Sequence, residues 1–296
     1  MENEIIVSID SLSPNNELIK SGIYVAKHFN AELSLLDFQF RTIAVNFGAI
    51  TATQGAMGFG NAGLQVIDQK ERVQKAEIEL NKISVATAKE WPHTTAKLYA
   101  PEGPVWEGDK SEYLIEEVNE QRPMLVMQTI KNDLNKINEL LGTPETKLAE
   151  EADCPVLLLP ENTSLSNVLS INYILEKDKL IEEVMKEVLF LRALLSKNAI
   201  KKAINIIYYF GDTPETAEKE IALKKSILIR EIGSDYLNFH NLSSENIEEH
   251  IQENIKKQAT HLFAFPKRNK SIIERLISHD NTKRLILKSQ IPVLVF

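Results

Sequence analysis

Short apolar runs alternate with amphipathic stretches along the first half of the chain. Residues 5–9 form a mostly β-branched run that ends at the polar, turn-prone segment 10–14. Across residues 16–29 the apolar positions recur at helical spacing and line one face. This pattern predicts a buried strand, a loop and then an amphipathic helix. The alternation continues, with strands expected at 33–38, 96–100, 124–127 and 154–159 and helices at 64–91 and 111–121.

The second half shows the same order of patterns. Thr213 followed by Pro214 is typical of a helix start, with threonine as the cap and proline at the first helical position. Strands are expected at 172–175, 204–210, 236–242, 261–265 and 291–296, with helices at 179–197, from 213, and around 247–255. Strands that alternate with helices of this length predict parallel strands joined by crossovers.

The two halves also repeat each other at a fixed distance. Leu125, Leu148 and Pro155 recur as Leu262, Leu285 and Pro292, each 137 positions later. A repeat of this length is too long for a solenoid and predicts two copies of one domain. We therefore expect an α/β protein of two tandem doubly wound domains, residues 1–161 and 162–296. Each should hold a mostly parallel five-stranded sheet with helices on both faces.

Charge and composition narrow the possible functions. The net charge is −8, and residues 1–161 hold 14 Lys/Arg against 25 Asp/Glu, hence −11. We therefore expect neither nucleic acid nor an anionic membrane as a partner. No basic leader or membrane-length apolar run is present in the sequence, which predicts a cytoplasmic protein. The single cysteine, Cys154, excludes an intrachain disulfide and is expected to be buried and inert.

Five landmarks, in order, resemble the universal stress protein family. The resemblance covers nearly all of both halves apart from residues 39–63, and it implies a five-stranded parallel sheet between helices, often in tandem. It also implies dimers that often join along the closing strand. The landmarks are the opening strand with its aspartate at Ile6–Ser11, the turn Glu102-Gly103-Pro104, the helix start Gly142-Thr143, and the closing strands at Cys154–Leu157 and Ile291–Leu294.

Nucleotide-binding members of that family carry a signature after the fourth strand: G-x-x-G, then nine residues, then G-S/T. Its glycines allow backbone N–H groups to bind the phosphates of the nucleotide. Here the leading stretch is Gln128-Thr129-Ile130-Lys131, so both leading glycines are absent, and Gly142-Thr143 follows ten residues later. In the second half the counterparts, Phe265–Arg268 and His279-Asp280, keep nothing of the signature. The sequence therefore argues against ATP as a tight ligand.

Three groups of residues are candidates for binding, each with a plainer alternative. Asp10 follows the first strand and either accepts hydrogen bonds from a nucleoside or caps the following turn. Gly142 and Thr143 either face phosphate or start a helix with Pro144 at its first position. Lys267, Arg268 and Lys270 either hold an anion at the edge of the second sheet or form a solvated charged turn.

Residues 39–63 interrupt the pattern. Gly58-Phe59-Gly60-Asn61-Ala62-Gly63 spells G-x-G-x-x-G, but a dinucleotide site requires that turn directly after a strand, and the preceding residues are loop-like. The five glycines and absence of charge in residues 48–63 predict an irregular segment that is mobile or held by an intermolecular contact. The six histidines show no metal-ligand spacing, and no G-x-S-x-G elbow is present.

These observations favour a binding or regulatory protein without a cofactor or catalytic residues, whose partner is an unknown protein or small ligand. The first alternative is an ATP- or AMP-binding, slowly hydrolysing protein that uses only the first half, through Asp10, Gly142 and Thr143. The second is an interaction protein that docks through residues 39–63. The apolar closing strands predict that the two halves pair along them as an intrachain pseudo-dimer, with a homodimer also possible.

Overall fold

The structure is a computed structural model of the chain. It describes residues 3–39, 58–100, 109–130, 144–176, 179–195, 203–210, 214–243, 253, 261–266 and 291–296.

The first half contributes five strands: β1 (Glu4–Ile9), β2 (Glu32–Phe38), β3 (Thr94–Tyr99), β4 (Leu125–Ile130) and β5 (Val156–Pro160). Its helices are α1 (Asn16–Phe29), α2 (Gly58–Glu90), α3 (Asp109–Gln121) and α4 (Pro144–Glu151). The second half contributes β6 (Ser170–Glu176), β7 (Ile204–Phe210), β8 (Leu237–Ser243), β9 (His261–Phe265) and β10 (Val293–Val295), with α5 (Ile181–Leu194) and α6 (Pro214–Ile232). A short 3-10 turn, η3 (Leu165–Asn167), lies between the halves.

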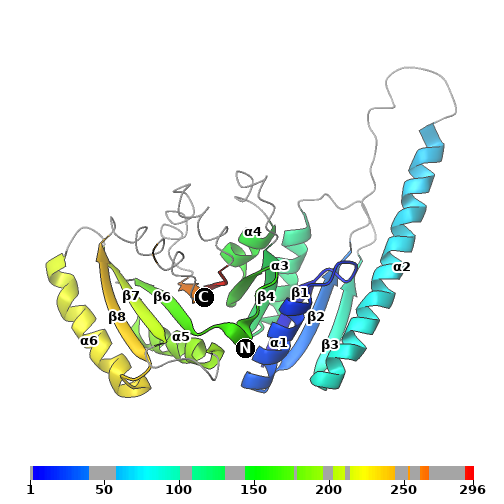
Figure 1. Cartoon of the computed structure of the whole chain (residues 1–296). Coiled ribbons are helices and arrows are strands. Elements are labelled where there is room, and N and C mark those ends of the chain that lie inside the picture. Colours follow the sequence, from blue (N-terminus) through cyan, green and yellow to red (C-terminus); the bar gives the residue numbers. More distant parts are fainter. Residues whose placement is uncertain are drawn as a thin grey trace.

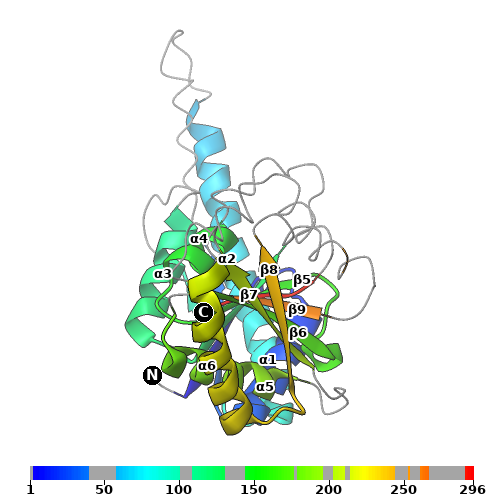
Figure 2. The same cartoon turned by 90° about the vertical axis from the view of Figure 1, so that its left-hand side faces the viewer.

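All ten strands form one sheet in the order β3-β2-β1-β4-β5-β10-β9-β6-β7-β8 (Figure 1). Within each half the strands are parallel, and the two halves share the order 3-2-1-4-5 counted along each half. Among the strands that the structure describes, one pairing is antiparallel: it joins β5 to β10, with Leu157 opposite Leu294. The prediction that the halves pair through their closing strands is therefore confirmed. Viewed from the second half, β8 and α6 stand at that end of the sheet (Figure 2).

Both faces of the sheet are covered by hydrophobic core. One core contains Ile5 and Val7 of β1 together with apolar residues of α1, α2, α5 and α6. The other contains Ile6 of β1 together with apolar residues of α3 and α4. Neighbouring residues of one strand thus face opposite cores, which is why the strands read as continuous apolar runs. We call these the α1 face and the α3 face.

Helix α1 approaches the sheet closely because it carries a glycine at the contact. A Cβ atom added to Gly22 would lie 2.7 Å from Val7 Cγ2 and 3.3 Å from Leu33 Cδ1. A side chain at this position therefore requires the buried Val7 to shift. At the C-terminal end of α1, Asn30 has a left-handed backbone (φ 51°), which is typical of a C-terminal cap.

Helix α2 differs from the expectation for residues 39–63. The helix begins at Gly58 and not near residue 64, so the hexapeptide Gly58–Gly63 is helical and forms no phosphate-binding turn. The expectation of an irregular segment is wrong for these six residues, since continuation of a long helix outweighed the low propensity of glycine. Residues 40–57 lie outside the described part, so mobility there stays a prediction.

The length of α2 takes it past the sheet. Its 33 residues span about 50 Å, whereas the six residues of β3 span about 20 Å. Its C-terminal part lies against the sheet, where Ala76 and Leu80 are buried, and its N-terminal part projects beyond the carboxyl ends of β1 to β3 (Figure 1).

Candidate functional site

In parallel sheets of this order, ligands bind beyond the carboxyl ends of the strands where the order reverses, which here means between β1 and β4. Polar side chains gather at this edge of the first half. Asp10 and Ser11 follow β1, Asp37 lies within β2 opposite Ile9, and Thr129 lies near the end of β4. We call this group of residues, together with Asn15 and Gln39, the edge cluster.

Asp10 lies where the sequence predicts, in the loop directly after β1. Its Oδ1 atom accepts a hydrogen bond from the backbone N–H of Leu12 at 3.1 Å, and its carbonyl accepts one from Ser13 at 3.1 Å. The Gln39 amide approaches the same Oδ1 at 3.5 Å. This is the geometry of a side chain that closes a turn, the plainer of the two alternatives for Asp10.

Asp37 is a central member of the cluster that the sequence analysis missed. Its side chain lies on the α1 face and is only 1% exposed. One carboxylate oxygen accepts from the backbone N–H of Ser11 at 3.1 Å and contacts the Ser11 hydroxyl, and the other accepts from Gln39 Nε2 at 2.9 Å. Burial raises the pKa of the Asp37 carboxyl, and these hydrogen bonds partly oppose that rise. The available signal was an aspartate near the end of a mostly apolar strand.

The Ser11 hydroxyl links this carboxyl to helix α2. Its oxygen lies 3.0 Å from the carbonyl of Ala76 and also contacts Asp37. The serine hydroxyl is thus within donating distance of both the Ala76 carbonyl and the Asp37 carboxyl. The contact fixes α2 at the sheet edge.

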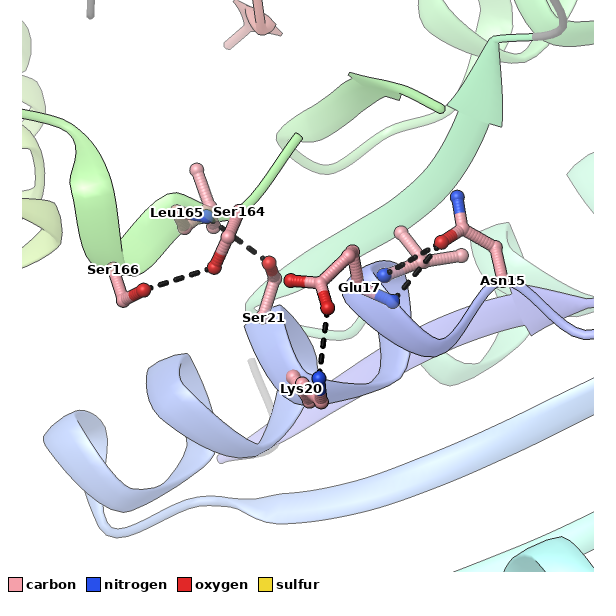
Figure 3. Close-up of polar contacts among 8 residues, drawn as sticks. Asn15, Glu17, Lys20, Ser21, Ser164, Leu165 and Ser166 are labelled. Carbon is pink, nitrogen blue, oxygen red and sulfur yellow. Dashed lines mark hydrogen bonds and ion pairs between the residues drawn. The ribbon is translucent and has the colours of Figure 1, made fainter. Parts of the chain in front are cut away.

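Asn15 joins the start of α1 to the end of β4. Its Oδ1 atom accepts from the backbone N–H groups of Glu17 and Leu18 at 3.0 and 3.2 Å, which caps the helix. Its Nδ2 group donates to Thr129 Oγ1 at 3.0 Å. Both ends of the amide are therefore engaged. Figure 3 shows the two bonds by which the Asn15 oxygen caps the start of α1.

The charges at this helix start also disfavour an anion. Glu17 lies in the first turn of α1, where a carboxylate complements the helix dipole. It pairs with Lys20 at 2.8 Å on the exposed surface (Figure 3). A phosphate here would meet a capped helix and a carboxylate, so the start of α1 is not arranged as an anion site.

Helix α1 also ties the edge cluster to the second half. The buried Ser21 hydroxyl accepts from the backbone N–H of Leu165 in η3 at 3.1 Å (Figure 3). Tyr24 donates its hydroxyl to the carbonyl of Leu195, directly after α5, at 3.1 Å. Phe29 stacks on Phe190 of α5 with ring centres 5.0 Å apart. These contacts fix α1 against the linker and α5.

The corresponding loop of the second half carries different chemistry. Lys179 follows β6, the counterpart of β1, and pairs with Glu187 of α5. The side chains are only 9% and 15% exposed, and the Tyr173 hydroxyl donates to the same carboxylate. This ion pair has no distinguishing pattern in the sequence, where Lys179 is one of several charges near a helix start.

The remaining candidates lie outside the described residues. These are Gly142 and Thr143 before α4, and Lys267, Arg268 and Lys270 after β9. Helices α4 and α6 begin at Pro144 and Pro214, so the predicted proline at the first helical position is confirmed in both. Cys154 is buried as expected. Among the described residues, no three His, Cys, Asp or Glu side chains gather as metal ligands, and no helix could cross a membrane.

Solved structures share this fold over nearly the whole chain. A universal stress protein from Archaeoglobus fulgidus DSM 4304 superposes with a TM-score of 0.61 at 15% identity, covering 99% of this chain and 96% of its own. A putative universal stress protein from Pseudomonas aeruginosa UCBPP-PA14 has a TM-score of 0.59 at 15% identity, with coverage of 100% and 93%. A functionally unknown protein from Pseudomonas aeruginosa PAO1 has a TM-score of 0.55 at 14% identity, with coverage of 100% and 92%.

No family model matches the sequence, and no curated protein matches it. At these identities the structural likeness establishes the fold alone. The chain therefore has the fold of universal stress proteins, and the resemblance stated from its sequence landmarks is confirmed at the level of the fold.

Proposed function

We propose that this protein is a binding or regulatory protein of the universal stress type that does not hold ATP tightly and is not an enzyme. One observation carries the proposal. The polar side chains at the carboxyl ends of β1 and β4 are engaged with one another, above all Asn15 with Thr129. A ligand that enters between the strands must break these contacts, and their loss reduces its net affinity.

The end of β4 supports the same proposal. Where a triphosphate site has a glycine-rich loop, this chain continues as strand through Ile130, which lies opposite Pro160 of β5. Gln128 and Thr129 are in register with Leu158 and Leu159. Backbone N–H groups held in a strand are not arranged around a phosphate as those of a glycine-rich loop are.

Thermal unfolding with and without nucleotide tests this proposal. A ligand that binds only the folded state stabilises it by RT ln(1 + [L]/Kd), about 2.7 kcal/mol at 100 times Kd. We expect no rise in Tm with ATP or AMP at concentrations about 100 times a micromolar Kd, and no phosphate release from ATP. A clear rise in Tm with either nucleotide would contradict it.

The alternative function is ATP or AMP binding in the first half, through Asp10, Gly142 and Thr143. The position of Asp10 favours it, because a half-buried carboxylate directly after β1 lies at the edge where nucleotides bind in such sheets. If nucleotide binds, Asp10→Ala and Gly142→Val should each weaken it. Asp235→Ala, which removes an exposed carboxylate of the second half, is the matched control. An affinity unchanged in both first-half variants would place the ligand elsewhere.

A partner protein or small ligand remains part of the proposal. Lys267, Arg268 and Lys270, which follow β9 in the sequence, are proposed as an anion contact. A triple substitution to alanine should weaken retention of an anionic partner without changing the far-ultraviolet circular dichroism spectrum. Retention equal to wild type would exclude these residues.

A further inference from the structure

Three asparagines form a row across the outer strands of the second half. Asn172 of β6, Asn205 of β7 and Asn238 of β8 lie in register side by side. Asn238 Nδ2 donates to Asn205 Oδ1 at 3.2 Å, and Asn205 Nδ2 donates to Asn172 Oδ1 at 2.9 Å. We call these three residues the asparagine ladder. It lies on the α3 face, because Ile174 and Ile207, two residues further along β6 and β7, belong to that core.

The ladder begins at a histidine and ends at a buried donor. Asn238 Nδ2 lies 2.8 Å from Nε2 of His240, on the same strand. Since both contacts of Asn238 use its NH2 group, His240 Nε2 is the acceptor and the neutral ring carries its proton on Nδ1. At the other end Asn172 is fully buried, and its Nδ2 group has no hydrogen-bond partner among the described residues.

We propose that protonation of His240 exchanges donor and acceptor in every hydrogen bond of the asparagine ladder. A proton that binds at the edge strand β8 thereby changes the orientation of the buried Asn172 amide in β6. Protonated Nε2 is a donor and cannot face the NH2 group of Asn238. Rotation of the Asn238 amide presents Oδ1 to the ring and to Asn205. Asn205 must then rotate to donate, and Asn172 rotates in turn.

The reversal conserves hydrogen bonds. The neutral state has three: Asn238 to His240, Asn238 to Asn205 and Asn205 to Asn172. The protonated state has the same three contacts with donor and acceptor exchanged at each. The proton adds to the Nε2 lone pair and no covalent bond breaks. The buried donor of Asn172 is replaced by a buried carbonyl oxygen, which is the less costly group to leave unpaired.

Strand β7 pairs with the strand that carries His240, and helix α6 covers the opposite face of the sheet. Ile207 of β7 lies opposite His240, and on the α6 side Lys225 lies 5.2 Å over the Phe239 ring and Lys224 is buried. Burial lowers the pKa of His240. In the first half the equivalent positions hold Ser34 and Thr95, whose hydroxyls lie 2.9 Å apart, and Lys97 in place of histidine.

Nuclear magnetic resonance of the full chain, labelled at asparagine and histidine, tests the proposal on the unmodified protein. We expect neutral His240 to be protonated on Nδ1. The side-chain amide of Asn172 should shift with pH at the same midpoint as the His240 ring, whereas that of Asn15, which is bonded to Thr129, should not. A neutral ring protonated on Nε2, or an Asn172 amide that does not move while His240 titrates, overturns the proposal.

Two variants locate the coupling. In Asn205→Val, the Asn172 amide should lose its pH response while Asn238 keeps it. In His240→Phe, both should lose it. An Asn172 amide that still titrates in His240→Phe contradicts the proposal. If either variant fails to fold, the two measurements on the wild-type chain decide the question alone.

Discussion

The side-chain amide of Asn15 donates a hydrogen bond to the hydroxyl of Thr129 across 3.0 Å, and so connects the start of α1 to the end of β4. The same amide caps α1 through its oxygen. This bond lies at the edge of the sheet where proteins of this topology bind ligands. The first half therefore uses the ends of these strands to hold its own structure.

Replacement of Asn15 should separate its two roles. Asn15→Ala removes the cap and the bond to Thr129, and we expect it to lower the free energy of unfolding by about 1–2 kcal/mol. Thr129→Val removes only the bond between the elements and should cost about 0.5–1.5 kcal/mol. Urea unfolding measures both. An Asn15→Ala variant as stable as wild type would show that the cap is not made.

Asp37 should make stability depend on pH. Burial raises its folded-state pKa, so the folded protein keeps this proton to a higher pH than the unfolded chain, whose carboxyl titrates near about 3.9. The stability that the proton contributes is complete below the unfolded pKa and is lost as the pH rises through the folded pKa. Asp37→Asn mimics the neutral form and should gain stability relative to wild type with rising pH.

The pH profile of urea midpoints for wild type and Asp37→Asn checks this expectation. Glu32→Gln, at an exposed position of the same strand, is the control and should follow wild type. A difference between Asp37→Asn and wild type that stays constant from about pH 4 to pH 8 would contradict the raised pKa.

Gly22 should resist any side chain. Gly22→Ala places a methyl group 2.7 Å from Val7 Cγ2 in the core, and such overpacking typically costs about 1–3 kcal/mol. The gain from alanine in a helix, about 1 kcal/mol, offsets part of this cost. We expect a net loss of stability that is partly recovered in the double variant with Val7→Ala. Additive losses in that cycle would show that the two positions do not touch.

The paired closing strands predict the behaviour of the isolated first half. Residues 1–161 end with β5, whose edge pairs with β10 in the full chain and is wholly apolar up to Pro160. An uncovered edge of this kind is a template for association. We expect this fragment to self-associate in light scattering and the full chain not to do so through this edge. A soluble monomeric fragment would show that β5 needs no partner strand.

The sequence predicts most of the fold and less of the site. Strands that are buried on both faces appear in the sequence as apolar runs, which is why β1, β5 and β7 could be predicted. The repeat of Pro155 at Pro292 predicted that the two halves share one topology. The contact of Asp37 with Ser11 and that of Thr129 with Asn15 could not be predicted, because each joins segments that are distant in sequence and meet only in the folded sheet. The sequence predicts the start of α2 near residue 64, because glycines have low helix propensity, whereas the helix begins at Gly58.

The asparagine ladder likewise could not be predicted from the sequence. Asn172, Asn205 and Asn238 are separated by 33 residues each time, and no local pattern connects them. Parallel pairing of β6, β7 and β8 brings them into one row. Polar residues within apolar strands were the available signal, but strand register was needed to interpret it.

Isothermal titration calorimetry of the full chain with ATP and with AMP tests the central claim most directly. The claim is that the ends of β1 and β4 are occupied by the protein's own contacts, Asn15 to Thr129 and Asp10 to Leu12. We expect no saturable heat from either nucleotide, which corresponds to a Kd weaker than about 1 mM. A saturable isotherm with a Kd near about 1 μM, abolished in Asp10→Ala, would contradict it.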